Sequence, residues 1–420
     1  MSEIITIAIG QCGIQMAQKF WELISHEHGI SDCTYMGTHE FQRERLNVFY
    51  RQASAGYIPR AIFVDLDAST GDRLRASLFY TTSGLNYENL IVGTQGTNRN
   101  WAKGHYTDGA ELIDRVLHTV RKEAAQADDP SFLIFHALGG GTGGGFGGLL
   151  INKLRETFEG SIIATVSVFP SSLESNHSHE PYNPVLSMQS LIENADLTFC
   201  IDNQALYNIC VRLLGLRNPT NADLNHLIAR AVSSMTAPLR FSGSNNNLST
   251  LRQMVNSLVP YSRLHFLTPA LTPLLNSASH SLTVAQLNGD MFDTTKYLVD
   301  VKLDDNQYLS AAALYRGQLS LSEIEQQLPK TVDISRVGVF ASPLPDTKTS
   351  ALLLANTTAI LSLFGRILHQ FSTLFSRMAY LHLYMGEGMD QMEFTEAESN
   401  LSDLIGEYQY YGQTIDDVEA

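Results

Sequence analysis

Short apolar runs alternate with amphipathic segments through the first half of this 420-residue chain. Runs of strand type occupy residues 4–9, 61–67, 90–93, 132–138, 161–169 and 198–202. Between them, apolar residues recur at helical spacing over residues 11–24, 108–127, 149–158, 183–194 and 204–214. This alternation predicts an α/β fold with a parallel sheet and helices on both faces. Ligands of such sheets bind over the carboxyl ends of the strands.

The second half of the chain starts with one long, mostly apolar segment. Residues 221–241 predict a helix that runs through the middle of the molecule, because no side of it is polar enough to be an exposed face. Strands are then expected near 264–271, 308–315, 335–340 and 350–355, with helices near 283–290 and 320–328. The last part is helical, near 357–376, 377–384 and 393–411.

A glycine-rich stretch, His136 to Gly148, joins a predicted strand to a predicted helix. Glycine lets a backbone approach a ligand closely, and the first amides of a helix form an anion site. The stretch therefore predicts a phosphate site, to which Thr142 adds a hydroxyl. A flexible linker is disfavoured because two periodic segments flank the glycines directly. A Walker A loop is excluded because no Lys-Ser/Thr follows, and the match to a dinucleotide fingerprint is weak.

Two further features are expected at the same edge of the sheet. The first strand ends at Gly10 and a helix opens at Gln11, which supplies a second set of free amides. Asp65 and Asp67 follow another strand and share a face in an extended chain. They could hold Mg²⁺ through water, or one of them could cap the next helix.

Composition narrows the class of protein. A net charge of −15 argues against a sequence-independent nucleic-acid binder. No apolar run is long enough to span a membrane, and no basic, apolar leader begins the chain. The four cysteines form no CxxC pair, so neither a zinc site nor a disulfide framework is indicated. We expect reduced thiols and a cytoplasmic protein.

Several stretches, in order from the first strand to the last helix, resemble the tubulin family. They are Gly10-Gln-Cys-Gly13, Trp101-Ala-Lys-Gly-His-Tyr-Thr107, the GGGTGGG loop, Glu180-Pro-Tyr-Asn183, Ile201-Asp-Asn203, Asp223-Leu-Asn225 and Gly386 to Asn400. The last stretch is most similar to β-type tubulin, of which this chain looks like a divergent, short member. The resemblance implies a Rossmann-like GTPase domain (1–203), a long central helix with an α/β intermediate domain (204–366) and a C-terminal helical hairpin (367–420).

The resemblance also implies a site for GTP or GDP with Mg²⁺. The residues that it implies around the phosphates are Gly10, Gln11, Cys12, Gln15, Gly96, Thr97, Asn100, Gly140, Gly141, Thr142, Gly143 and Gly144. Asp65 and Asp67 would hold Mg²⁺ through water together with Gln11. Glu180 would bind the ribose, while Asn203 and Asn225 would read the guanine edge, since an amide both donates and accepts. Helix capping is the other interpretation of Asn203.

The sequence departs from the family pattern at three positions of this site. Gly144 stands where tubulins usually have Ser, so a hydroxyl is missing. Asn221 stands where an aromatic residue usually stacks on the base. Arg99 replaces an Asn in the phosphate turn, where it either faces the γ-phosphate with a fixed charge or points to solvent.

Hydrolysis in the family uses an acid that one subunit supplies to the nucleotide of its neighbour. Here Thr250 and Gln253 occupy the positions of the acids, and the sequence has no Asp or Glu between Asp223 and Asp290. We therefore expect no catalytic residue of its own toward the neighbour, as in the β-like half of a heterodimer. The GTPase would be weak alone and completed by a neighbouring subunit.

Assembly is expected to be longitudinal, head to tail, into protofilaments or microtubule-like filaments, with itself or with an α-like tubulin. The loop 276–281 and the stretch between Pro329 and Leu352 are short for a tubulin, which makes lateral contacts a weaker expectation. The long acidic tail of many tubulins is absent. Two alternatives stay open: a nucleotide-dependent enzyme, such as a dehydrogenase, and a tubulin-like GTP-binding protein that does not polymerise.

Overall fold

The computed structural model describes residues 2–171, 178–244, 248–274, 282–301, 307–328, 334–345 and 347–419. The side chains of residues 244, 335 and 414–419 are not part of this description. His177, the predicted lateral loop 276–281 and residues 329–333 lie outside it.

One 11-stranded sheet runs through the molecule. Its strands, in spatial order, are β11 (Gly243–Ser244), β14 (Ile334–Phe340), β13 (Tyr308–Arg316), β15 (Ser350–Thr357), β12 (Phe266–Thr272), β10 (Leu197–Asp202), β9 (Ile163–Phe169), β8 (Pro130–Ala137), β1 (Glu3–Ile9), β6 (Ala61–Asp65) and β7 (Leu90–Val92). From β12 to β7 every pairing is parallel, as the sequence predicts. Two small hairpins, β2 (Ile30–Ser31) with β3 (Thr34–Tyr35) and β4 (Tyr50–Ala53) with β5 (Gly56–Pro59), lie between α1 and β6.

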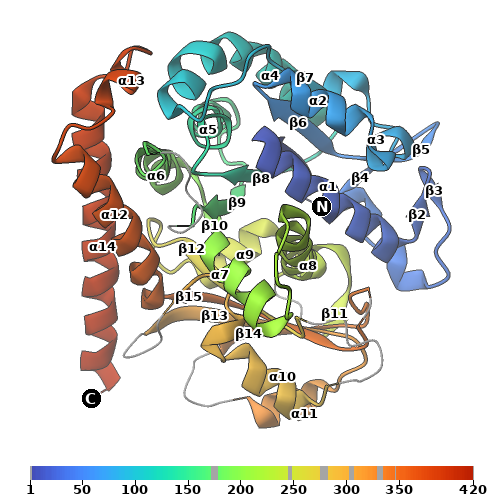
Figure 1. Ribbon diagram of the computed structural model, residues 1–420. Coiled ribbons are helices and arrows are strands. Elements are labelled where there is room, and N and C mark those ends of the chain that lie inside the picture. Colours follow the sequence, from blue (N-terminus) through green and yellow to red (C-terminus); the bar gives the residue numbers. More distant parts are fainter. Residues whose placement is uncertain are drawn as a thin grey trace.

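Helices cover both faces of the sheet (Figure 1). In the first half they are α1 (Gly10–His28), α2 (Ala68–Arg75), α3 (Leu78–Thr82), α4 (Asp108–Ala124), α5 (Gly147–Thr157), α6 (Tyr182–Asn194) and α7 (Asn203–Asn208). After them come α8 (Asn221–Arg240), α9 (Leu251–Leu258), α10 (Val284–Met291), α11 (Leu321–Gln327), α12 (Leu361–Phe375), α13 (Leu381–Met385) and α14 (Gln391–Glu419). One core packs α4, α5, α6, α12 and α14 on one face, and a second core packs α1, α8 and α9 on the other.

The two halves of the chain share the sheet. Strand β12 pairs in parallel with β10 through only two residue pairs, Thr198 with Phe266 and Phe199 with Leu267. Beyond β12 the sheet becomes mixed, because β15 runs antiparallel to both β12 and β13. Helix α8 lies between the halves and is almost fully buried from Leu224 onward, which confirms the predicted central helix. Helices α12 and α14 run along one side of both halves (Figure 1).

The glycine-rich stretch is more regular than the sequence indicates. Residues Gly141–Phe146 form a π-helical turn that leads directly into α5, so the helix begins earlier than the predicted residue 149. A second π-helical turn, Lys103–Thr107, packs against it. A Cβ on Gly104 would lie 2.0 Å from the carbonyl oxygen of Gly141, and a Cβ on Gly145 would lie 2.1 Å from that of Trp101. These glycines therefore allow two backbones to touch, a tertiary role that the sequence does not reveal.

Candidate functional site

A cavity of about 830 Å³ opens at the carboxyl ends of β1, β6, β8, β9 and β10. Most of the residues predicted from the sequence line it: Gly10, Gln11, Cys12, Gln15, Asp65, Asp67, Gly96, Thr97, Arg99, Gly140, Gly141, Thr142, Gly143, Glu180, Asn203, Asn221 and Asn225. Residues from seven separate segments thus meet at one edge of the sheet, where parallel α/β folds bind ligands.

A buried histidine, His136, holds the glycine loop through a hydrogen bond. The Nδ1 atom of His136 donates to the carbonyl oxygen of Gly143 (2.8 Å), and its Nε2 lies 2.7 Å from the hydroxyl oxygen of Ser167. Because a carbonyl can only accept, Nδ1 carries a proton. Burial lowers the pKa of His136 to about 4, so the ring stays neutral near pH 7.

Two predicted residues, Asn100 and Gly144, do not line the cavity. The side-chain oxygen of Asn100 accepts from the backbone of Ala102 (2.9 Å), and its amide donates to the carbonyl oxygen of Leu383 in α13 (2.8 Å). Gly144 faces α6, where an added Cβ would lie 2.4 Å from the Ser187 hydroxyl. Asn100 therefore anchors the phosphate turn, and position 144 is a packing position.

The two carboxylates differ in environment. Asp67 caps α2 by accepting from the backbone nitrogen of Ser69 (2.9 Å), which confirms the capping interpretation for one of the pair. Asp65 is 3% exposed, and burial raises the pKa of its carboxyl even though the backbone nitrogen of Asp67 donates to it (3.2 Å). A cation nearby would offset that burial, so two carboxylates beside the Gln11 amide fit Mg²⁺ held partly through water.

Amide side chains gather at another part of the cavity. Asn203, Asn221 and Asn225 line it from α7 and α8, and the Asn225 amide lies 3.5 Å from the side-chain oxygen of Gln15. The capping interpretation of Asn203 is wrong, because Asp202 caps α7 by accepting from the backbone nitrogen of Gln204 (3.0 Å). The Glu180 carboxylate lies beside Gly139, within 2.6 Å of the position of an added Cβ.

The cavity also contains residues that the sequence did not single out. Thr70, Gln95, Asn98, Gly139, Ser171 and Leu224 line it, and all of them except Ser171 are close in sequence to a predicted residue. Asn183 lies behind the lining, where its amide donates to the carbonyl oxygens of both Arg99 and Gly139 (2.8 Å each). Its place in the Glu180–Asn183 motif is the one signal that could have found it.

Thr250 and Gln253 lie outside this cavity, at the start of α9. Thr250 caps the helix by accepting from the backbone nitrogen of Gln253 (3.2 Å), and the Gln253 side chain accepts from the backbone and the hydroxyl of Ser249 (2.8 Å each). The amide of Gln253 thus stabilises a helix start on the surface.

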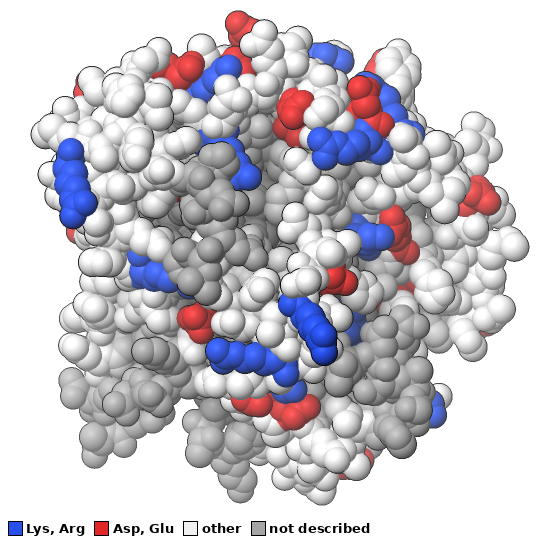
Figure 2. Space-filling model, viewed as in Figure 1, with Lys and Arg blue, Asp and Glu red and all other residues white. Residues whose placement is uncertain are grey.

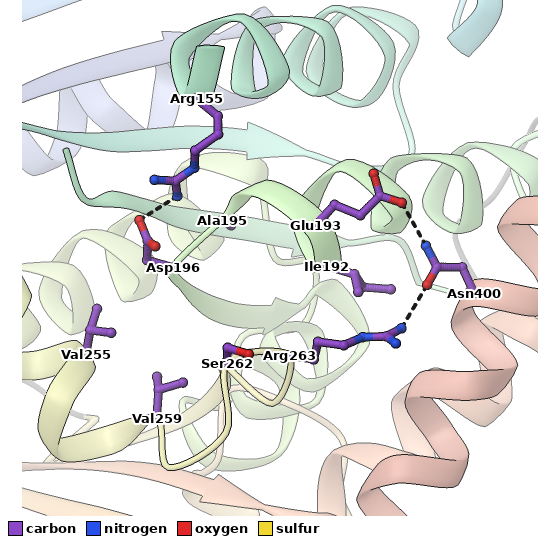
Figure 3. A pocket seen from close by; sticks show the side chains of 10 residues that line it. All are labelled: Arg155, Ile192, Glu193, Ala195, Asp196, Val255, Val259, Ser262, Arg263 and Asn400. Atoms are coloured by element: carbon purple, nitrogen blue, oxygen red, sulfur yellow. Dashed lines mark hydrogen bonds and ion pairs between the residues drawn. The ribbon is translucent and has the colours of Figure 1, made fainter. Parts of the chain in front are cut away.

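A second cavity, of about 510 Å³, separates α6 from α9 and α14 (Figure 3). Several of its polar side chains bond to one another. Arg155 pairs with Asp196 (2.7 Å), and Asn400 both accepts from Arg263 (2.9 Å) and donates to Glu193 (3.2 Å). Because these side chains bond to one another, their role is to hold the surrounding elements together.

The surface and the helices add two observations. Figure 2 shows basic and acidic side chains interspersed over one face of the molecule. Among the described helices, none combines the length and apolar character needed to cross a lipid bilayer.

Comparison with known families agrees with the geometry of the first cavity. Residues 3–211 match the Tubulin/FtsZ family, GTPase domain, and residues 262–369 match the Tubulin C-terminal domain. The first match covers every strand that contributes to the cavity, and the second begins just before β12. The chain therefore belongs to the Tubulin/FtsZ family, as a GTP-binding protein with a tubulin-type GTPase domain and C-terminal domain.

Proposed function

We propose that this chain is a β-like cytoskeletal subunit that binds GTP or GDP with Mg²⁺ and assembles head to tail into protofilaments. The observation that carries the proposal is the cavity itself, which brings together the backbone of the glycine loop, the carboxylates of Asp65 and Asp67 and the amides of Asn203 and Asn225. The glycine loop and the amides of α1 hold the phosphates, Glu180 the ribose, and Asn203 and Asn225 the base edge. With Asn221 in place of a stacking aromatic, base recognition rests on hydrogen bonds.

The chain supplies no acid to a neighbouring subunit. Gln253 and Thr250 are neutral, and their polar atoms take part in capping α9. Neither group can accept a proton from water at neutral pH. The nucleotide of this chain is then hydrolysed only when another subunit brings a carboxylate to the open side of the cavity.

Longitudinal assembly is supported by exposed apolar side chains in α13 and just before it, a segment that contacts the phosphate turn. Met378, Leu383 and Met385 are 66%, 39% and 48% exposed, and Leu383 is bonded through its carbonyl to Asn100 of the phosphate turn. Clusters of exposed apolar side chains mark interaction sites. A subunit docked there would lie against the nucleotide, as head-to-tail assembly requires.

The test is GTP turnover of the purified chain, alone and mixed with α-like tubulins, together with electron micrographs of each mixture. We expect little hydrolysis by the chain alone and faster hydrolysis in filaments with a partner that carries the acid. Brisk turnover by the chain alone would contradict the proposal. If the chain also self-assembles, Gln253→Glu should raise its turnover, while Asn256→Asp, which adds an exposed acid to the same helix, serves as the control.

A further inference from the structure

A buried carboxylate lies directly before one of the amides of the nucleotide cavity. Asp202 ends β10, and Asn203, which lines the cavity, is the next residue and the first of α7. The Asp202 side chain is fully buried. A carboxylate in such a place is costly unless it accepts hydrogen bonds and faces an opposite charge. The groups around Asp202 therefore decide whether the start of α7 keeps its position.

The Asp202 carboxylate fixes the first turn of α7. Its Oδ1 atom accepts from the backbone nitrogen of Gln204 (3.0 Å) and so caps the helix. The side-chain oxygen of Gln204 in turn accepts from the hydroxyl of Ser171, another residue that lines the cavity (2.6 Å). Asn203 lies between these two anchored residues, so its backbone follows the position of the carboxylate.

The counter-charge comes from a distant part of the chain. A guanidinium nitrogen of Arg366, in α12, lies 2.9 Å from Oδ2 of Asp202. Burial raises the pKa of the Asp202 carboxyl, the Arg366 guanidinium opposes that rise, and the charge of Asp300 adds to it. Arg366 thus favours the ionised carboxylate, which is the stronger acceptor for the Gln204 amide.

Backbone contacts hold α12 at this place. The backbone nitrogen of Asp202 donates to the carbonyl oxygen of Leu298 (2.8 Å), and the hydroxyl of Ser362 donates to that of Asp300 (3.0 Å). The segment 298–300 therefore lies between the end of β10 and the first turn of α12. Ser362 and Arg366 are four residues apart, hence on the same side of the helix. The approach of Arg366 to Asp202 is built into the packing of α12.

We propose that Arg366 is a positioning residue for base recognition: by neutralising the buried Asp202 carboxylate, it keeps Asn203 where its amide reads the edge of guanine. This inference rests on the proposed function, in which Asn203 contacts the base. Without Arg366, the carboxylate either takes up a proton or moves toward water. Both changes weaken the cap of α7 and displace Asn203, which cannot keep a hydrogen bond to the base from a shifted position.

The experiment compares the dissociation constants for GTP and ATP, both with Mg²⁺, in the full chain and its variants. The two nucleotides share the ribose and the triphosphate, so the ratio of their constants reports recognition of the base. Arg366→Gln should weaken GTP binding about tenfold, as expected for one lost hydrogen bond, and leave ATP binding within about threefold. A general loss of stability would weaken the binding of both nucleotides alike.

Two further variants test the route through Asp202. Adding Asp202→Asn to Arg366→Gln removes the unpaired charge while keeping an oxygen that caps α7, so it should restore most of the preference for GTP. Asp202→Ala removes the cap without leaving a buried carboxylate. It should reduce the preference for GTP as Arg366→Gln does, and it keeps the test open if Arg366→Gln does not fold.

The matched control is an ion pair at the other end of β10. Arg155 pairs with Asp196 (2.7 Å), which directly precedes the strand. Arg155→Gln removes the same kind of charge far from α7. It should lower the thermal midpoint slightly and leave the ratio of the GTP and ATP constants unchanged.

The outcomes separate the inference from the proposed function. An equal loss of GTP and ATP binding in Arg366→Gln, or an unchanged preference in the folded variant, would overturn the role of Arg366. A double variant as poor as Arg366→Gln, or an unchanged preference in Asp202→Ala, would overturn the route through Asp202. If the unaltered chain binds GTP no more tightly than ATP, base reading by the amides fails before the variants are compared.

Discussion

Glycines of one loop serve different purposes in this site. Gly145 faces the π-helical turn, where a Cβ would lie 2.1 Å from the carbonyl oxygen of Trp101. Gly140 has no atom within 4 Å of its added Cβ, and its φ of −98° suits any residue. Gly145 is required because two backbones touch there. Gly140 is required because a side chain there would enter the cavity.

Alanine at these two positions should therefore separate folding from binding. Gly145→Ala should lower the free energy of unfolding by more than about 2 kcal/mol, because backbone on both sides resists displacement. Gly140→Ala should change it by less than about 1 kcal/mol and instead weaken GTP binding. Urea unfolding and nucleotide affinity measure the two effects. A Gly145→Ala protein as stable as the parent would contradict the packing argument.

At the scale of single residues, the sequence predicted the residues that line the cavity better than the buried residues that hold them in place. Residue types that suit phosphate and metal, such as Thr142 and Asp65, could be identified from local patterns, whereas Asn225 was found only through the resemblance to tubulin. The roles of His136, Asn183 and Gly145 depend on which segments touch across the fold, and local spacing carries no such information.

Between elements, one buried ion cluster connects α1, α8 and β13. Glu27 pairs with Arg240 (2.7 Å) and Arg316 (3.0 Å), and all three side chains are at most 1% exposed. Burial alone would raise the pKa of Glu27, but the two guanidinium groups outweigh it and hold the pKa at about 2. Since α1 starts at the phosphate loops and β13 lies in the second half, this cluster joins the two halves of the chain.

Removing the carboxylate of Glu27 should destabilise the fold strongly. Glu27→Gln leaves two buried guanidinium groups without a counter-charge, and we expect it to lower the free energy of unfolding by about 3–5 kcal/mol. Glu22→Gln on the same helix breaks an exposed pair with Lys19 and should change it by no more than about 1 kcal/mol. Chemical denaturation of both variants makes the comparison. Similar losses of unfolding free energy in the two variants would show that burial does not determine how much the ion cluster stabilises the fold.

The elements themselves followed closely from the pattern of apolar positions, with most ends within a few residues of the prediction. The sequence did not reveal that β12 continues the first sheet. Strand order depends on which edges pair, and the two residue pairs that join β10 to β12 leave no periodic signal.

Across the whole molecule, burial disfavours the charged form of several histidines. Burial lowers the pKa of His28 to about 3 and of His136 to about 4, and it also lowers the pKa of His105 and of His265. In the unfolded chain these rings take up a proton near pH 6.5. Below that pH the unfolded state binds more protons, so the stability of the fold decreases as the pH falls toward the folded-state pKa values.

The chain should consequently be sensitive to mild acid. Between pH 7 and pH 5, His28 and His136 should each remove about 2 kcal/mol from the free energy of unfolding. The raised pKa values of Asp65 and Asp202 act in the opposite sense, since the folded state then binds protons first. Urea titrations across this range test the net slope, and His136→Asn should make it shallower. A slope unchanged in that variant would exclude His136 as a contributor.

The close approach of Ser187 to Gly144 restricts which side chains position 144 can accept. The hydroxyl of Ser187 occupies the space that a side chain at position 144 would need, 2.4 Å from the position of its Cβ. A second obstacle is the carbonyl oxygen of Leu138, which lies 2.8 Å from the same Cβ position and belongs to the backbone. A serine at position 144 therefore requires the Ser187 side chain to turn away and the backbone at Leu138 to shift. Ser187→Ala removes only the first obstacle, so it should lower the cost of a side chain at position 144 without abolishing it.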